Sequence, residues 1–134
     1  MINIFLVLIG GALGSLARYG LGIWARTMWP ASEWPIGTFL ANLLGGVLMG
    51  LLMGALLGPL KSVAWGPFDA ERWRLFLGIG VLGGFTTFSS FSLETVFMLE
   101  RRHYLMALGY AVLSVGLAVG GVVLGLILMR KVAV

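Results

Sequence analysis

The chain has 134 residues, of which 60% are hydrophobic and only 10% are charged, and its formal net charge is +4. Soluble domains are far less apolar, so this composition excludes a soluble enzyme and indicates an integral membrane protein. The sequence contains no cysteine, which excludes disulfides, thiolate metal sites and thiol catalysis. The basic charge fits anchoring near lipid headgroups and argues against nucleic-acid binding.

Four apolar stretches follow one another along the chain, each at least as long as the roughly 20 residues that cross a bilayer as a helix. They cover about residues 2–28, 36–60, 75–99 and 104–129. Almost nothing is left outside the membrane. The sequence therefore predicts a single all-α transmembrane domain over residues 1–134, with no separate domain for catalysis, so we do not expect an enzyme.

The charges at the ends of the spans give only a weak preference for one orientation. The side shared by the N-terminus, the second connection and the C-terminus carries Lys61, Arg72, Arg74, Arg130 and Lys131, and the opposite side carries Arg26, Arg101 and Arg102. Because basic residues favour the cytoplasmic side, five against three is a small bias. Dual topology is therefore a hypothesis, in which two oppositely inserted copies pair as inverted repeats do.

Small residues repeat along one face of the second span. Glycines recur every four residues, and the same stripe continues backwards through two polar residues: Gly46, Gly50, Gly54 and Gly58, then Asn42 and Thr38. The glycines predict close contact with a neighbouring helix. For the polar pair, position alone leaves two interpretations open, a hydrogen-bonded link between helices or the lining of a pore.

The first and fourth spans show related patterns. Glycines that we expect to pack closely are Gly10 and Gly14 in the first span, and Gly116, Gly120, Gly121 and Gly125 in the fourth. Tyr110 and Ser114 are four residues apart and share one helix face. Each of the two is more often structural when taken alone, but their alignment predicts a second inward-facing polar track.

The third span contains the run Gly83-Gly84-Phe85-Thr86-Thr87-Phe88-Ser89-Ser90-Phe91-Ser92-Leu93-Glu94. Two glycines followed by two threonines lower helix propensity at one point. In lipid, a backbone that leaves the helical path is tolerated only where it is buried in protein or lines a cavity. We therefore expect a break near residues 83–87 and the functional site beside it.

Phenylalanines recur at intervals of three around this break. Core packing is the better interpretation of Phe85. Phe88 and Phe91 follow the break directly, beside a new helix N-terminus whose free N–H groups favour an anion. Because the edge of an aromatic ring is positive, these two rings can coordinate a small anion weakly enough for it to leave again.

Two ionisable residues fall within the spans, where such groups are costly and usually functional. Arg18 is near enough to one end to snorkel, or to donate to carbonyls freed at the break, so we favour a structural role. Glu94 can accept protons or hydrogen-bond the hydroxyls of a polar track. His103 lies in a short connection, where an exposed side chain is expected.

Taken together, these residues resemble the Fluc or CrcB fluoride channels over essentially the whole chain. The shared runs are Gly-Ser-Leu-Ala-Arg-Tyr ending at Tyr19, Thr38 followed by Ala41-Asn42-Leu43-Leu44-Gly45, and the long run from Gly83 to Glu94. The resemblance implies a passive, fluoride-selective channel of the bacterial inner membrane that lowers cytoplasmic fluoride toxicity. It further implies an antiparallel dual-topology homodimer with two pores and a central structural Na⁺ ion.

The resemblance also assigns roles to residues. The fluoride pore would comprise Phe88, Phe91, Asn42, Tyr110, Ser114, Thr38 and Glu94. Main-chain carbonyls of Gly83 and Thr86 from both subunits would hold the Na⁺, and Arg18 matches the structural arginine of the first helix. Two departures stand out: Ala118 occupies a position where relatives can carry a hydroxyl, and the 58–71 connection is long.

Two other classes of protein remain possible from the residues alone. A proton-coupled small multidrug exporter also uses four short helices and dual topology, and it would depend on Glu94 as its membrane carboxylate. A non-transporting assembly subunit would account for the glycine stripes. Replacing Phe88 and Phe91 with isoleucine separates the three, since only a channel should lose conduction while remaining dimeric.

Overall fold

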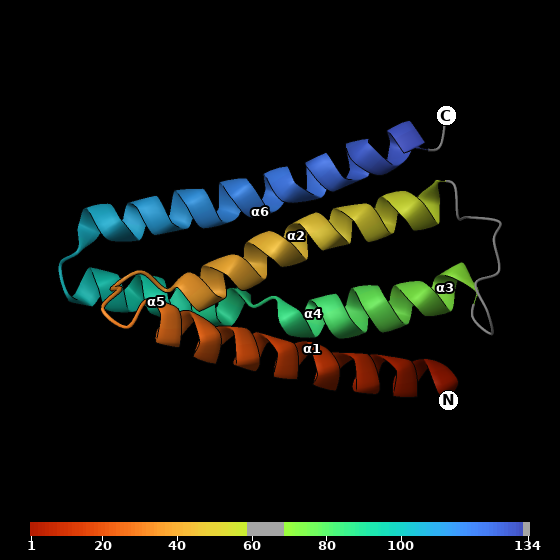
Figure 1. The fold of residues 1–134 in the computed structure, drawn as a ribbon, viewed down its shortest axis with the longest axis horizontal. Helices are drawn as coiled ribbons and strands as arrows, with labels where there is room; N and C mark the ends of the chain where they lie inside the picture. Colours follow the sequence, from red (N-terminus) through yellow and green to blue (C-terminus); the bar gives the residue numbers. More distant parts are fainter. Residues whose placement is uncertain (59–68, 133–134) are drawn as a thin grey trace.

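The protein is built from helices throughout the residues that its computed structural model describes, 1–58 and 69–132. In this part of the chain four helical segments are long and apolar enough to cross a membrane, and the third is broken near its middle. The prediction of an all-α membrane protein with a broken third helix is confirmed. Figure 1 shows the segments running roughly side by side, with both termini at one end of the bundle.

The first two spans are unbroken helices. Helix α1 runs over Ile2–Met28 and helix α2 over Ile36–Leu57. The expected end of the second span at residue 60, and most of the 58–71 connection with Lys61, lie outside the described residues. At the other end of the bundle, the 29–35 connection joins α1 to α2 (Figure 1).

The third span is assembled from several pieces. Helix α3 covers Ala70–Trp73, the π-helical segment η1 covers Arg74–Leu82, helix α4 covers Gly83–Phe85, and helix α5 covers Phe88–Glu100. The span begins before residue 75 because the Asp69 side chain caps it, accepting a hydrogen bond of 2.8 Å from the Arg72 backbone N–H. The last helix, α6, covers Tyr104–Val132 and extends beyond residue 129.

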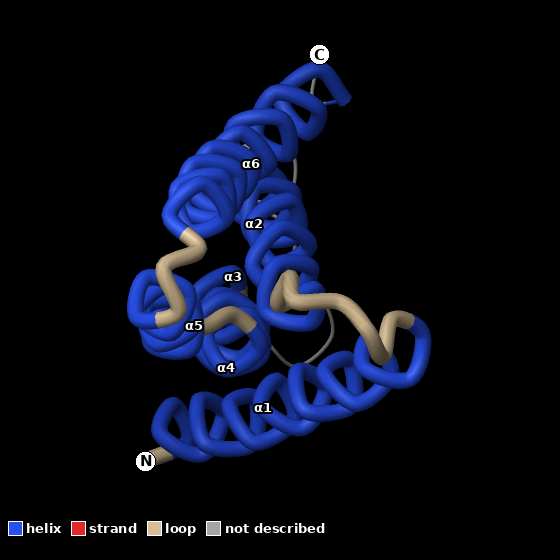
Figure 2. The backbone as a smooth tube through the Cα atoms, turned by 90° about the vertical axis from the view of Figure 1, so that its left-hand side faces the viewer, coloured by secondary structure: helices blue, strands red, loops and turns tan. Residues whose placement is uncertain are grey.

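Glycines set the closest helix contacts. A methyl group at Gly14 would overlap the Val81 carbonyl oxygen, and one at Gly84 would overlap Gly11, so α1 packs directly on the backbone of η1 and α4. The view in Figure 2 shows α1 passing close to α4 and α2 lying along α6.

The glycines of α2 contact α6 in the same way. Methyl groups at Gly46 and Gly50 would overlap the carbonyl oxygens of Ala118 and Val122. The predicted close packing is therefore found for the α2 stripe. In α6 it is found for Gly121 and Gly125, whereas Gly116 and Gly120 have open space at the Cβ position in the described part of this single chain, so close packing at these two stays a prediction.

Candidate functional site

The break in the third span is confined to two residues. Thr86 and Thr87 have extended backbones, with φ/ψ of −81°/157° and −153°/117°, whereas Gly83 and Gly84 remain helical. The break is thus narrower than the expected 83–87, and the hydroxyls of the two threonines bond the helix ends on either side of it. Thr86 Oγ1 donates to the Leu82 carbonyl at 3.0 Å, and Thr87 Oγ1 caps α5 by accepting from the Ser90 N–H at 3.2 Å.

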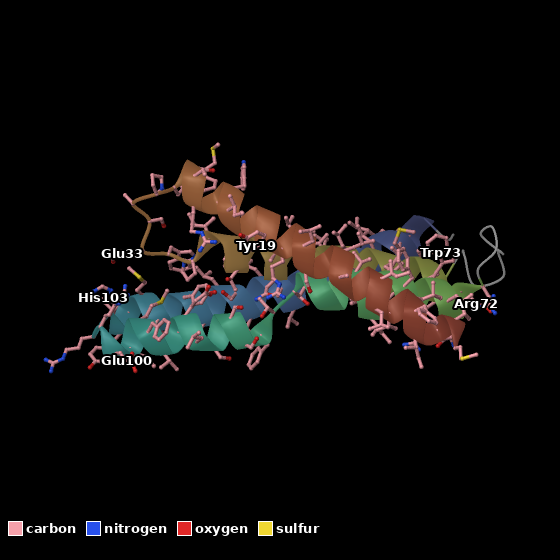
Figure 3. The ribbon with its side chains drawn as sticks, turned by 90° about the horizontal axis from the view of Figure 1, so that it is seen from below. Tyr19, Glu33, Arg72, Trp73, Glu100 and His103 are labelled. Atoms are coloured by element: carbon pink, nitrogen blue, oxygen red, sulfur yellow. The ribbon has the colours of Figure 1, made fainter. Side chains whose placement is uncertain are left out.

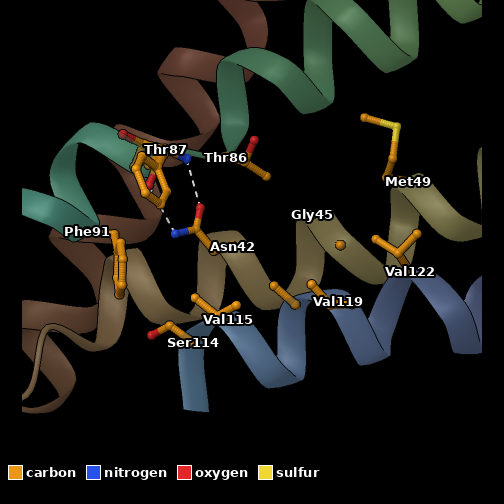
Figure 4. A pocket seen from close by; sticks show the side chains of 13 residues that line it. Asn42, Gly45, Met49, Thr86, Thr87, Phe91, Ser114, Val115, Val119 and Val122 are labelled. Carbon is orange, nitrogen blue, oxygen red and sulfur yellow. Dashed lines mark hydrogen bonds between the residues drawn. The ribbon is translucent and has the colours of Figure 1, made fainter. Parts of the chain in front are cut away.

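Asn42 of α2 holds the break in place. Its Oδ1 accepts a hydrogen bond from the Thr87 N–H at 2.7 Å, and its Nδ2 donates to the Thr87 carbonyl at 3.0 Å (Figure 4). In an uninterrupted helix the Thr87 N–H would bond the Gly83 carbonyl, four residues earlier. Asn42 therefore substitutes for a helix bond, and this side chain is a link between helices.

Arg18 approaches the break from α1. Its Nε donates to the Gly84 carbonyl at 3.2 Å, an oxygen that in a continuous helix would receive the N–H of Phe88. A buried carbonyl without a donor is costly, and a guanidinium is well suited to supply one. This contact agrees with the structural role expected for Arg18.

Glu94 is the centre of a polar cluster one turn beyond Phe91. Its carboxylate accepts two hydrogen bonds of 2.7 Å, from Thr38 Oγ1 at one oxygen and from the Tyr110 hydroxyl at the other. The three residues come from α5, α2 and α6. Thr38, which position alone left open between two roles, thus joins α2 to α5 through this cluster.

The rings of Phe88, Phe91 and Tyr110 lie in a row, here called the aromatic file, that leads from the break to this cluster. Phe88 is 76% exposed and Phe91 is buried, with ring centroids 5.5 Å apart. Phe91 in turn lies 5.3 Å from Tyr110, which is fully buried. Phe85 is not part of the file, since its ring packs against Gly45 of α2, as core packing predicts.

A groove with a volume of about 390 Å³ opens beside the break. It is lined by Asn42, Thr86, Thr87, Phe88, Phe91 and Ser114 at one end, and by Gly45, Gly46, Met49, Val115, Ala118, Val119 and Val122 along the rest (Figure 4). None of these lining residues is ionisable. Ala118 lies in the apolar stretch, so the groove is polar only near the break.

Ser114 contributes the most unusual polar group of the groove. Its side chain is only 5% exposed, and its Oγ has no hydrogen-bond partner among the described residues. A buried hydroxyl without a partner costs free energy, and such a group in a native structure calls for a ligand or a function. The lining of the groove therefore includes a buried hydroxyl that has no partner at hydrogen-bond geometry among the described residues.

The structure brings all seven expected pore residues into two adjoining groups. Asn42, Phe88, Phe91 and Ser114 line the groove, and Thr38, Glu94 and Tyr110 form the cluster next to it. Gly83 does not line the groove, whereas Thr86 does.

Sequence reasoning assigned no separate role to Thr87 or Trp34. The Thr87 hydroxyl caps α5, and the Thr87 backbone donates one hydrogen bond to the Asn42 amide and accepts another from it. A threonine three residues before a helical N–H is a recognisable capping signal. The ring of Trp34 lies 5.5 Å from that of Tyr110, a contact between segments far apart in the sequence for which no local signal exists.

Comparison with known proteins places the chain in a family. Residues 5–126 match the family model described as CrcB-like protein, Camphor Resistance (CrcB). The fluoride-specific ion channel FluC of Caulobacter sp. (strain K31) is 47% identical over 136 residues, which cover 98% of each chain. FluC of Phenylobacterium zucineum (strain HLK1) is 51% identical over 129 residues and 96% of each chain. The chain belongs to the CrcB family.

Proposed function

We propose that this multi-pass membrane protein is a fluoride-selective channel that conducts the anion passively, and that it is not an enzyme. The observation that carries the proposal is the groove at the helix break, whose lining brings together Asn42, the rings of Phe88 and Phe91, and the Ser114 side chain. The relatives named as fluoride-specific ion channels support the same function for this chain.

The chemistry of the groove suits a small anion. Fluoride is strongly hydrated, so its passage needs compact donors that replace water, and hydroxyl and amide groups are such donors. One Asn42 N–H is used by the Thr87 carbonyl, which leaves the second N–H of that amide for a ligand. Since no lysine or arginine lines the groove, the ion is bound weakly enough to leave.

The path is completed by a second copy of the chain. Phe88 is 76% exposed in the single chain, so one copy alone does not enclose an ion beside that ring. The weak charge bias between the two sides favours insertion in both orientations. An antiparallel homodimer would cover two such grooves and so provide two pores.

A structural Na⁺ ion fits the backbone at the break. Because the Thr87 N–H donates to Asn42, the Gly83 carbonyl does not receive that N–H as it would in a continuous helix. The backbone of Thr86 is extended. Hard cations of this kind are bound by backbone carbonyls of interrupted membrane helices. The main-chain carbonyls of Gly83 and Thr86 from two copies, which the family resemblance implies as ligands, are the proposed sodium ligands.

The proposed setting is the inner membrane of a bacterium, where the channel would let fluoride leave the cytoplasm and so reduce its toxicity. A proton-coupled exporter is less well supported, because both carboxylate oxygens of Glu94 already accept hydrogen bonds from hydroxyls inside the cluster. An exporter needs a carboxylate that exchanges protons and cations with both sides.

The double substitution F88I/F91I tests the proposal. It keeps two apolar side chains but removes the ring edges that would face the ion. The reconstituted variant is expected to remain dimeric and to release fluoride far more slowly than the wild type. Unchanged fluoride release would show that these rings do not line the path, and proton-coupled cation transport that is lost in Glu94→Gln would favour the exporter.

A further inference from the structure

Trp34, in the connection between α1 and α2, closes the far end of the aromatic file. Its ring lies 5.5 Å from that of Tyr110 with the two planes at 87°, an edge-on contact. Phe91 lies against the same tyrosine at 5.3 Å. Tyr110 is therefore enclosed between two rings, and this enclosure leaves it no exposed surface.

The backbone of the connection fixes Trp34 in this place. The Ser32 hydroxyl accepts from the Trp34 N–H at 3.1 Å, and the Trp34 carbonyl accepts from the Ile36 N–H at 2.8 Å at the start of α2. The indole also lies 6.1 Å from the ring of Phe39. Glu33, the preceding residue, lies 3.6 Å from His103 Nδ1, which joins the connection to the turn before α6 (Figure 3).

A second hollow of about 320 Å³, here called the end cavity, lies on the other side of Trp34. Its lining includes Trp34, Thr38 and Glu94, together with Arg26 and Trp29 at the end of α1. Thr38 and Glu94 are also members of the cluster with Tyr110, whereas Phe91 lines the groove at the break. The cluster thus separates two hollows, and an ion that crosses it passes from the groove into the end cavity.

We infer that the end cavity is the mouth through which the anion reaches water, and that Trp34 is a positioning residue that sets selectivity at the constriction beside Tyr110. This inference rests on the proposed function. The indole packs against Tyr110, whose ring also contacts Phe91 and whose hydroxyl donates to Glu94, and so limits the movement of this ring at the constriction. A narrow passage with fixed donors admits fluoride and excludes the larger chloride.

Selective substitution of two tryptophans tests the role of Trp34. Trp24 is the control, since its ring contact is with Trp29 at 5.5 Å and not with Tyr110, and it is not among the residues that line the end cavity. In liposomes, Trp34→Ala is expected to lower the ratio of fluoride to chloride release by about threefold to tenfold, the factor to which the loss of one aromatic pair corresponds. Trp34→Phe, which keeps a ring, and Trp24→Ala are expected to match the wild type.

The absence of cysteine from the sequence allows a second test that leaves Trp34 intact. A cysteine placed at Ser32, which lines the end cavity, is expected to conduct more slowly after a bulky, charged methanethiosulfonate reagent modifies it than the same variant does before modification. A cysteine at Thr27, which is exposed on the last turn of α1 but does not line this cavity, is the control and should react without effect.

The outcomes separate the inference from the proposed function. If the wild type releases fluoride while Trp34→Ala and Trp24→Ala have the same selectivity, the inference is overturned and the channel assignment stands. Equal effects of the reagent at residues 27 and 32 overturn the end cavity as the mouth. A wild-type protein that releases no fluoride overturns both.

Discussion

Asn42 and Thr87, 45 positions apart in the sequence, are joined by two hydrogen bonds that run in opposite directions between the amide of one and the backbone of the other. The pair fixes the non-helical residue at the middle of the third span to α2. Because a backbone N–H and C=O in lipid must be satisfied within the protein, this one side chain makes the break possible.

Removing the amide should therefore destabilise the fold. In Asn42→Ala the Thr87 N–H and C=O lose their partners, and each unsatisfied group costs about 1–3 kcal/mol. Thermal unfolding in detergent should show a lower midpoint than for Leu48→Ala, a control on the same helix whose side chain is 47% exposed. Equal midpoints for the two variants would mean that the break is held by other contacts.

Ser114→Ala should separate stability from function. The hydroxyl is buried without a partner among the described residues, so its removal should leave the free energy of unfolding unchanged or raise it by about 1 kcal/mol. The same change removes a donor from the groove, and fluoride release should slow. A variant that is less stable and conducts normally would contradict the role given to this hydroxyl.

Tyr110→Phe keeps the ring between Phe91 and Trp34 but removes the hydrogen bond to Glu94. A hydrogen bond to a charged group contributes about 1.5–3 kcal/mol, so a loss of stability and slower fluoride release are expected together. Tyr104→Phe, at an exposed position at the start of α6, is the control and should behave as the wild type. Fluoride release that survives Tyr110→Phe at full rate would exclude this hydroxyl from the path.

Alanine at two glycines of α1 should have opposite effects. A methyl group at Gly14 would overlap the Val81 carbonyl oxygen, so Gly14→Ala should cost more than about 2 kcal/mol by overpacking. Nothing lies within 4 Å of the Cβ position at Gly20, where alanine should add up to about 1 kcal/mol through helix propensity. Thermal unfolding of both variants measures the difference, and destabilisation by both would point to packing against another copy at Gly20.

Removal of Na⁺ tests the proposed metal site. Transfer of the purified protein into buffers with N-methylglucamine as the sole cation should weaken the dimer and slow fluoride release, and added Na⁺ should restore both. Size-exclusion chromatography and flux in the same preparation give the two readouts. Dimers that persist and conduct without Na⁺ would argue against a structural ion.

The arrangement of the spans could be predicted from the sequence because apolar length alone decides which segments enter a bilayer. The start of the third span was placed too late, since Glu71, Arg72 and Arg74 lower the local hydropathy although Asp69 caps a helix there. The low helix propensity of two glycines followed by two threonines predicts the region of the break. Its confinement to Thr86 and Thr87 depends on hydrogen bonds from the threonine side chains and from Asn42 of another helix.

The geometry of the site was less accessible to sequence reasoning. Thr38 and Glu94 are 56 positions apart, and their hydrogen bond depends on how α2 and α5 pack. The enclosure of Tyr110 by Trp34 likewise depends on the path of the 29–35 connection. The spacing of the glycines also does not show which of two neighbours packs on α2. Adjacent residues face different directions on a helix, and Gly121 contacts α2 whereas Gly120 has open space in the described part of the chain.

Fluoride release from liposomes tests the central claim most directly. Wild-type protein reconstituted into vesicles loaded with potassium fluoride should release the anion rapidly when valinomycin allows K⁺ to follow, as recorded with a fluoride electrode. Matched vesicles loaded with potassium chloride should retain their anion. Absence of fluoride release from correctly folded dimers, or equal release of both anions, would contradict a fluoride-selective channel.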